Sequence, residues 1–280
     1  MGRDSIEERS VSSVEVAGLT DQGRVRKNNE DSFLIADLSR QKPEPGSLSK
    51  ASLRVQGGGL LLAVADGMGG EKAGERASAI ALEALLRSIG EAPSTVAAED
   101  ALRSAVEQAN REVQAASQEP DCEGMGATLT ACLFRDGAVD IAEVGDSRAY
   151  LLRDGRLQQL TKDQSFVQLL IDTQGLTEQE ARASGYRNVI LQAIGKTVDL
   201  QVGMSRLELQ RGDRLLLCTD GLTAMTEDAD IQQILLENAA LDTACSRLVA
   251  SANEHGGRDN ITVILAGVGR DGDGGPEPSA

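Results

Sequence analysis

The sequence is poor in aromatic residues and in positive charge. Aromatics make up 2% of the 280 residues and tryptophan is absent, so the stacking platforms that bind single-stranded nucleic acid are not expected. The chain has 28 Lys and Arg against 44 Asp and Glu, a formal net charge of -16. Such a surface repels nucleic acid and anionic membranes, and we expect neither as a partner. A phosphate site would need local cations or metal ions.

Histidine and cysteine are also scarce. There is one histidine, His255, and the four cysteines (Cys122, Cys132, Cys218 and Cys245) form no CxxC pair. A zinc site is therefore not expected, because zinc is held mainly by Cys and His. Cysteine-based phosphatases need an arginine six residues after the cysteine, and none of the four cysteines has one. We expect a reduced, cytoplasmic protein in which Cys132 and Cys218 pack inside strands.

Long apolar runs are missing as well. No run approaches the roughly 18 residues of a membrane span, and the first ten residues, MGRDSIEERS, include acids and no apolar segment of a signal peptide. These absences support the expectation of a cytoplasmic protein with no membrane partner.

Apolar periodicity predicts alternating blocks of strands and helices. Strands are expected at 14–19, 33–38, 60–65, 128–134, 139–144, 149–152, 202–209, 214–218 and 261–268, and helices at 75–89, 98–117, 164–172, 177–183, 228–237 and 242–254. This order is not the strict alternation of a doubly wound sheet; it favours an α+β protein with packed sheets and helix pairs outside.

The predicted organisation is one folded domain, residues 13–268, between two tails. Residues 1–12 are expected to be a flexible N-terminus. Residues 269–280 have the sequence GRDGDGGPEPSA, which cannot form a core and is expected to be disordered. Residues 39–59 contain two prolines and a run of glycines, and predict a loop.

Two segments run from an apolar strand straight into Asp-Gly: LLLAVADGMGG, with Asp66, and RLLLCTDGLTA, with Asp220. Asp-Gly is a strong hairpin signal, so a plain turn is one interpretation. However, a helical pattern follows each segment instead of a returning strand. The alternative is an aspartate held at the end of a rigid strand as a metal ligand, with glycine allowing close backbone approach.

Four more carboxylates lie at predicted strand ends or tight turns: Glu30, Asp31, Asp146 and Asp259. Six converging carboxylates could not all stay ionised without cations. Oxygen ligands favour Mg²⁺ or Mn²⁺, with Ca²⁺ left open. Two such ions, about 3.5–4 Å apart, would activate a bridging water for attack on phosphorus.

The stretch RKNNEDSF, residues 26–33, places Arg26 beside the first two of these acids. A solvated turn is the simpler interpretation. A guanidinium beside metal-binding carboxylates would instead hold two phosphate oxygens. Other phosphate chemistries fit poorly, because GMGGEKAGE lacks a phosphate-loop pattern and VGDSRA lacks the second glycine of a serine elbow. His255, beside a glycine, is expected to be a capping or solvent residue, with general-acid catalysis as the alternative.

Taken in order, six motifs resemble the metal-dependent protein phosphatase (PPM) family of the bacterial protein phosphatase 2C type. They are GRVRKNNEDSF, VADGMGG, GMGATLTACLF, VGDSRAYLLRDG, CTDGL and GGRDNITVI, within residues 14–268. The resemblance implies a four-layer α-β-β-α sandwich, a central antiparallel β-sandwich flanked by helix pairs. It also implies hydrolysis of phosphoserine and phosphothreonine in proteins by a water that bridges two metal ions. The implied substrates are a bacterial Ser/Thr kinase and its target proteins, so the enzyme would reverse the action of that kinase. A monomer is expected.

The resemblance assigns roles to the acids. Asp66 would bridge both Mn²⁺ or Mg²⁺ ions. Asp220 and Asp259 would complete one metal site. Glu30 and the backbone carbonyl of Gly67 would serve the other.

Further roles follow from the same resemblance. Asp31 would orient metal-bound water, and Asp146, with Asp220, would hold a third ion. Arg26 would bind the substrate phosphate. Residues 164–188 would form a flap beside the active site that affects substrate choice, and Asn260 would shape its loop.

The chain departs from the family at two positions. Met68 follows Gly67 where some relatives have a histidine nearby, and the sequence before the predicted flap is Asp163, Gln164, Ser165 where bacterial relatives often have Asp-His-Ser. These departures imply that metal-bound water protonates the leaving group. Two other functions remain open: a catalytically inactive phosphoprotein-binding module, and a phosphatase for an anti-sigma-factor antagonist.

Overall fold

The structure, a computed structural model, describes residues 14–38, 51–53, 59–177, 180–181, 185–186 and 189–269. The predicted flexible N-terminus (1–12) and residues 270–280 of the predicted tail lie outside these ranges. So do most of the predicted loop 39–59 and part of the predicted helix 177–183.

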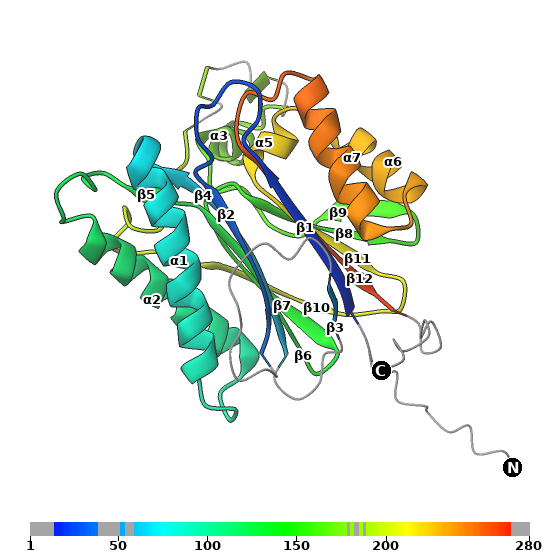
Figure 1. Ribbon diagram of the computed structural model, residues 1–280, viewed down its shortest axis with the longest axis horizontal. Helices are drawn as coiled ribbons and strands as arrows, with labels where there is room; N and C mark the ends of the chain where they lie inside the picture. Colours follow the sequence, from blue (N-terminus) through cyan, green and yellow to red (C-terminus); the bar gives the residue numbers. More distant parts are fainter. Residues whose placement is uncertain are drawn as a thin grey trace, which may run out of the picture.

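Two sheets of antiparallel strands form the centre of the molecule (Figure 1). The first has the order β3-β1-β12-β11-β8-β9. Its strands are β1 (Val14–Asp21), β3 (Ala51–Leu53), β8 (Arg148–Arg153), β9 (Arg156–Gln159), β11 (Arg214–Cys218) and β12 (Ile261–Val268).

The second sheet has the order β10-β7-β6-β4-β2, and the short β5 pairs with β4. Its strands are β2 (Asp31–Asp37), β4 (Leu60–Met68), β5 (Gly126–Ala127), β6 (Leu129–Arg135), β7 (Ala138–Val144) and β10 (Gly203–Glu208).

Helix pairs cover the outer faces of both sheets. Helices α1 (Glu71–Glu91) and α2 (Ala98–Ala116) pack on the second sheet, and α6 (Asp228–Glu237) and α7 (Leu241–Glu254) lie on the first. Two more helices, α3 (Phe166–Gln174) and the one-turn α5 (Asp220–Thr223), lie at one end of the sandwich (Figure 1). The four-layer α-β-β-α prediction is confirmed.

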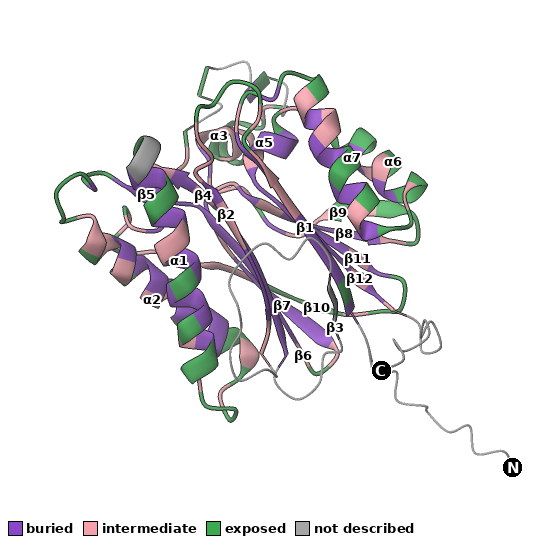
Figure 2. Ribbon diagram, in the orientation of Figure 1, coloured by how far each residue is buried: buried purple, intermediate pink, exposed green. Residues whose placement is uncertain are grey.

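The continuous apolar run of β4 reflects burial on both faces (Figure 2). Leu60, Leu62 and Val64 belong to the core between the two sheets, whereas the alternate residues Leu61 and Ala63 belong to the core beneath α1 and α2. Because successive strand side chains point to opposite faces, a strand with both faces covered is apolar at every position. All four cysteines are buried and free, and Cys132 and Cys218 lie in β6 and β11, as predicted.

Three short elements differ from the sequence prediction. Residues 51–53, inside the predicted loop, form β3 by pairing with β1. Residues 156–159 form β9 against β8. Asp220 starts the helical turn α5 instead of ending a strand. Pairing with a neighbouring strand, which no local pattern encodes, decides whether segments as short as β3 and β9 form strands.

Antiparallel pairing places most loops with predicted site residues at one end of the sandwich. Strands β1, β4, β7 and β11 all end there, and β2, β6, β8 and β12 all begin there. The β1–β2, β7–β8 and β11–α5 connections, and the loop before β12, therefore meet at this end. The ends of a rigid sandwich thus bring together acids that are far apart in the sequence.

The buried leucines of β4 should carry much of the stability. We expect Leu62→Ala, which removes a side chain with no exposed area, to lower the free energy of unfolding by about 2–5 kcal/mol. The matched change Leu236→Ala, on a side chain that is 54% exposed, should stay within about 0.5 kcal/mol. Urea unfolding measures both; equal effects would contradict this assignment of the core.

Candidate metal and phosphate site

Asp31 and Asp66 lie directly opposite each other on neighbouring strands, β2 and β4. Like charges in this position repel, so the pair needs other groups to hold it. Asp31 Oδ2 accepts hydrogen bonds from the hydroxyls of Thr219 (2.8 Å) and Thr262 (2.6 Å). Its other oxygen, Oδ1, is buried and has no hydrogen-bond partner among the described residues.

Asp66 is held through its backbone. Its N–H donates to Thr128 Oγ1 (3.0 Å), and its C=O accepts the Thr128 N–H (2.9 Å). The next residue, Gly67, donates its N–H to the C=O of Glu30 (3.2 Å). Both strands are therefore fixed at their ends, with the Asp66 carboxylate left free of these bonds.

Asn260 positions the loop that carries Glu30. Its Oδ1 accepts the Glu30 N–H (2.8 Å), and its Nδ2 donates to the C=O of Gln22 and of Asn28, each at 2.9 Å. The Asn260 side chain thus holds the β1–β2 connection as well as lying in its own loop before β12. One amide side chain thus joins the start of β12 to the β1–β2 connection.

Gly74, in the first turns of α1, makes room for two of the predicted ligands. A Cβ at Gly74 would lie 2.2 Å from Glu30 Oε2 and 2.9 Å from the Gly67 carbonyl oxygen. At Gly67 a Cβ would in turn lie 2.1 Å from the Gly74 carbonyl oxygen. The helix and the loop approach this closely only because both positions are glycine.

Asp146, in the β7–β8 turn that joins the two sheets, and Asp220, after β11 of the first sheet, complete the acidic group. Asp220 Oδ1 is buried and without a hydrogen-bond partner among the described residues. Arg148 offsets part of this charge, and its guanidinium forms a two-bond ion pair with Asp163 at 2.8 and 2.7 Å. The field of Arg148 lowers the pKa of both Asp146 and Asp220, but less than burial raises it.

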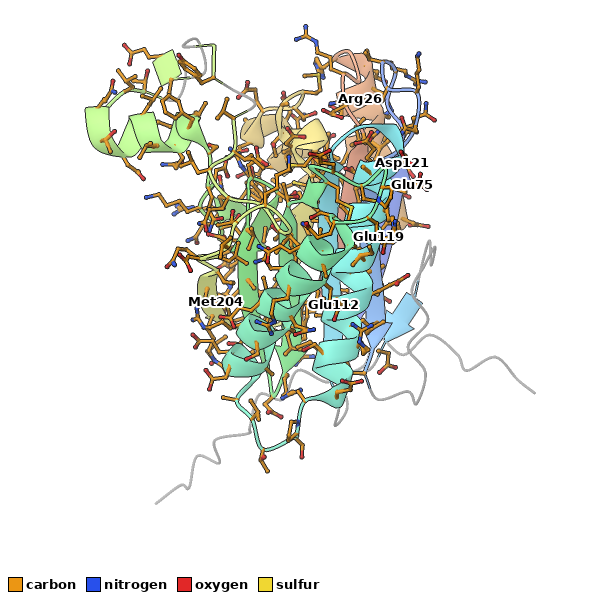
Figure 3. The ribbon with its side chains drawn as sticks, turned by 90° about the vertical axis from the view of Figure 1, so that its left-hand side faces the viewer. Arg26, Glu75, Glu112, Glu119, Asp121 and Met204 are labelled. Carbon is orange, nitrogen blue, oxygen red and sulfur yellow. The ribbon has the colours of Figure 1, made fainter. Side chains whose placement is uncertain are left out.

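Arg26 forms an ion pair with Asp259, Nη2 to Oδ2 at 2.7 Å. Its side chain is 51% exposed, so the guanidinium is accessible from solvent. Figure 3 shows Arg26 at the upper end of the molecule in that view, the end where the strand connections meet. The positively charged side chain of Arg26 therefore lies on the solvent side of the acidic group.

Four carboxyl groups of the site, those of Asp31, Asp66, Asp146 and Asp220, have a pKa raised above the usual value. Burial is the main cause and the neighbouring carboxylates add to it: the pKa is raised to about 7 for Asp31, about 8 for Asp146 and about 6 for Asp220. The pKa of Asp66 is raised well above its usual value, first by burial and then by Asp31. Mutual repulsion of this kind is the signature of acids that share one site.

These residues fit a divalent cation. The donors are all oxygen, two buried carboxylate oxygens (of Asp31 and Asp220) lack a partner among the described residues, and the repulsion among the acids would be relieved by positive charge. Within the described ranges, no three His, Cys, Asp or Glu side chains are grouped tightly enough to enclose an ion. A shell of carboxylates closes only when a cation offsets their repulsion.

Several supporting residues escaped the sequence analysis. Thr128, Thr219 and Thr262 hold the aspartates, and Gly74 gives them space. The sequence does contain a signal for Gly74, because a glycine inside a helix lowers helix stability by about 1 kcal/mol relative to alanine. Its presence there indicates that another group packs closely against the helix. His255 lies exposed at the end of α7, with Nδ1 2.9 Å from the Ser251 carbonyl oxygen, as expected for a capping residue.

Fold and site together define a class: an α-β-β-α sandwich with a carboxylate-rich cation site and an arginine at its mouth. The sequence pattern of the family described as protein phosphatase 2C matches residues 49–265. The chain belongs to this family.

Curated relatives and solved structures agree with this assignment. The chain is 35% identical over 250 residues to the serine/threonine phosphatase stp of Listeria monocytogenes, covering 88% of this chain and 92% of the relative. It is 40% identical over 256 residues to the serine/threonine protein phosphatase PstP of Mycobacterium tuberculosis, covering 90% of this chain and 44% of that longer protein.

Two solved structures show the same fold. The serine/threonine phosphatase of S. agalactiae superposes with a TM-score of 0.80 at 33% identity, covering 91% of this chain and 99% of that one. The PstP catalytic domain, solved in complex with two manganese ions, has a TM-score of 0.75 at 36% identity, covering 92% of this chain and 99% of that one.

Among the described residues of this chain, no helix is long and apolar enough to cross a membrane.

The space at Gly74 can be tested against a second glycine of the same helix. We expect Gly74→Ala to displace both the Glu30 carboxylate and the Gly67 carbonyl, which the added Cβ would approach to 2.2 and 2.9 Å, and so to weaken Mn²⁺ binding at least about tenfold. Gly90→Ala, where no described atom lies within 4 Å of the added Cβ, should leave Mn²⁺ binding unchanged. Calorimetric titration of both variants decides; equal affinities would rule out this role.

The raised carboxyl pKa values predict an unusual pH dependence of stability. Between about pH 4, where unfolded aspartate titrates, and the folded pKa values of about 6 to 8, the folded chain binds more protons than the unfolded chain. Stability of the metal-free protein should therefore fall as pH rises from 5 to 8. Added Mn²⁺ should restore more stability at pH 8 than at pH 5.

Thermal unfolding in EDTA and in Mn²⁺ at the two pH values measures this effect. Asp66→Asn, which removes one of the repelling charges, should reduce the fall in EDTA. A melting temperature in EDTA that rises from pH 5 to pH 8 would contradict the assignment.

Proposed function

We propose that this chain hydrolyses phosphoserine and phosphothreonine in proteins in a reaction that depends on divalent metal ions. The observation that carries the proposal is the meeting of Asp31, Asp66, Asp146 and Asp220 at one end of the sandwich, with Arg26 beside them. The names of the relatives, serine/threonine phosphatases of bacteria, support the same activity.

In this proposal Glu30, Asp66, the Gly67 carbonyl, Asp220 and Asp259 hold two Mn²⁺ or Mg²⁺ ions, and Asp146 contributes to a third site. The two manganese ions of the PstP catalytic domain support the number two. When bound, such ions lower the pKa of water and neutralise charge on phosphoryl oxygens. The work of the protein is to fix the ligands and to orient the substrate.

Arg26 is proposed to bind the substrate phosphate. Its guanidinium is half-exposed and currently bonds one oxygen of Asp259 through Nη2. Its planar fork can hold two phosphate oxygens in place of a carboxylate. Because Asp259 is itself a proposed metal ligand, a cation on Asp259 and a phosphate on Arg26 would together replace the ion pair seen in the structure.

Asp31 is proposed to orient the attacking water. The hydroxyls of Thr219 and Thr262 fix one carboxylate oxygen, which leaves Oδ1 as the oxygen available to accept a proton. The two threonines therefore determine which oxygen of Asp31 faces the reaction.

Finer features also belong to this proposal: a Ser/Thr kinase and its targets as the source of substrates, a cytoplasmic location, and a monomeric state. The net charge of -16 argues against nucleic acid and anionic membranes as partners. An inactive phosphoprotein-binding module fits less well, because every proposed metal ligand is present in the chain.

The test is release of phosphate from a phosphothreonine peptide. We expect activity with Mn²⁺ or Mg²⁺ and none with EDTA. Asp220→Ala should lower kcat/KM by at least about a hundredfold, because it removes a ligand from the ions that carry the chemistry. The matched control Asp230→Ala, on the exposed face of α6, should be unaffected.

A wild type that binds Mn²⁺ without hydrolysing any phosphopeptide would favour the binding-module alternative. Activity that survives EDTA, or that survives Asp220→Ala, would contradict the proposed metal site.

A further inference from the structure

Positively charged residues gather in the two loops next to the acidic group. The β1–β2 connection carries Arg24, Arg26 and Lys27 within four residues, and the loop before β12 adds Arg258. All four residues are exposed to solvent. Because the whole chain has a formal net charge of -16, this group of cations stands out against the acidic composition of the molecule. We refer to Arg24, Lys27 and Arg258 as the cationic rim.

Arg26 has an acidic partner in the structure, but the cationic rim has none. Nη2 of Arg26 lies 2.7 Å from Asp259 Oδ2. Across the described ranges, no carboxylate forms an ion pair with a side chain of the rim. In contrast, three arginines of α1 and α2 are paired with glutamates: Arg76, Arg87 and Arg103. The rim cations are therefore available to bind an anion from outside the chain.

Backbone contacts hold the two loops together, independently of the rim side chains. The Arg24 N–H donates to the Gly257 carbonyl (2.7 Å). A Cβ at Gly23 would lie 2.1 Å from the Asp259 carbonyl oxygen, so the loops touch at this point. The Arg24 side chain passes over Gly257, where an added Cβ would lie 2.8 Å from the Arg24 Cγ. Arg24 therefore lies beside the backbone that carries Arg258, and replacing either side chain leaves the backbone contacts in place.

The rim lies within reach of the substrate residues next to a phosphothreonine bound by Arg26. Arg24 and Lys27 are two and one residues from Arg26, so their Cα atoms lie within about 7 Å of the Arg26 Cα. That distance equals about two residues of an extended substrate chain. Charges this close act within the screening length of about 8 Å at physiological salt, whereas acids elsewhere on the surface are largely screened. Once metal ions offset the acids of the site, we expect the rim to set the field beside Arg26.

We propose that the cationic rim binds a second anionic group of the substrate, a phosphoryl group or a carboxylate, one to three residues from the phosphothreonine. The proposal rests on the proposed function, in which Arg26 binds the phosphate that is removed. The two arginines of the rim present planar forks that fit either anion, and Lys27 adds a point charge. The protein therefore selects acidic or doubly phosphorylated segments, although its net charge alone would favour basic ones.

The test compares phosphothreonine peptides that differ at one residue, two positions before or after the phosphothreonine. That residue is glutamine, glutamate, lysine or the phosphonate analogue of phosphoserine, which cannot be hydrolysed. The kcat and KM of phosphate release are measured with Mn²⁺ at low and at high salt. Arg24→Gln/Arg258→Gln removes two rim charges. The matched control, Arg135→Gln/Arg156→Gln, removes two charges at the opposite end of the sandwich, where β6 ends and β9 begins.

We expect the wild type to favour the phosphonate peptide over the glutamine peptide about tenfold in kcat/KM, and the glutamate peptide about threefold, because exposed charge pairs form only with the anions. The preference should appear mainly in KM and should shrink at about 0.5 M salt. Arg24→Gln/Arg258→Gln should bring both ratios to within about twofold of one, whereas the control pair should keep the wild-type ratios.

Charge reversal gives a second measurement. Arg24→Glu/Arg258→Glu should favour the lysine peptide over the glutamine peptide, because the reversed rim attracts a cation. A general loss of structure would lower the rates for all peptides and would not reverse the preference.

Three results would overturn the proposal: a wild type that hydrolyses all the peptides equally well, a preference that survives Arg24→Gln/Arg258→Gln, or an equal loss of preference in the control pair. Preference for the phosphonate alone would limit the rim to phosphoryl groups, whereas preference for both anions would extend it to carboxylates. If the double variant does not fold, Lys27→Gln should lower both ratios about twofold, and unchanged ratios would contradict the proposal. A wild type that hydrolyses none of the peptides would overturn the proposed function and the rim with it, which distinguishes the two failures.

Discussion

The repulsion among buried carboxylates at one end of the sandwich is the constraint on which the rest of this structure depends. Asp31 and Asp66 face each other on two neighbouring strands, Asp146 approaches from the turn that joins the two sheets, and Asp220 follows a strand of the first sheet. Burial first, and then the neighbouring carboxylates, raise the pKa of each of these groups, so the ionised arrangement is unfavourable without a compensating charge. Threonine hydroxyls, the two-bond pair of Arg148 with Asp163 and the pair of Arg26 with Asp259 each offset part of it, and a divalent cation would offset the remainder.

Only a rigid support can hold such a group together. The strands that end at the site are buried on both faces, with β4 contributing to two cores at once. The hydrophobic free energy of these layers, about 25 cal/mol per Å² of apolar surface buried, opposes the electrostatic cost of the site. Burial of apolar side chains between the layers therefore stabilises the fold, whereas the repelling carboxylates at the end that carries the site lower its stability.

Close approach matters as much as charge. Gly67 and Gly74 let a loop and a helix meet around Glu30, and Gly145, the residue before Asp146, fits against Thr128, which holds the backbone of Asp66. The arrangement of the acids therefore depends on glycines at which any side chain would collide with a neighbour.

The sequence by itself determined the class of fold, the boundaries of long elements such as α6 and β12, and the acids of the candidate site, because apolar periodicity and Asp-Gly after a strand are local signals. Only the tertiary structure decided that Asp31 pairs with Asp66, that Thr219 and Thr262 hold one oxygen of Asp31, and that Gly74 leaves room for Glu30. The short strands β3 and β9 belong to this second group. Each depends on partners distant in the chain, and contacts of that kind leave no periodic trace in the residues that make them.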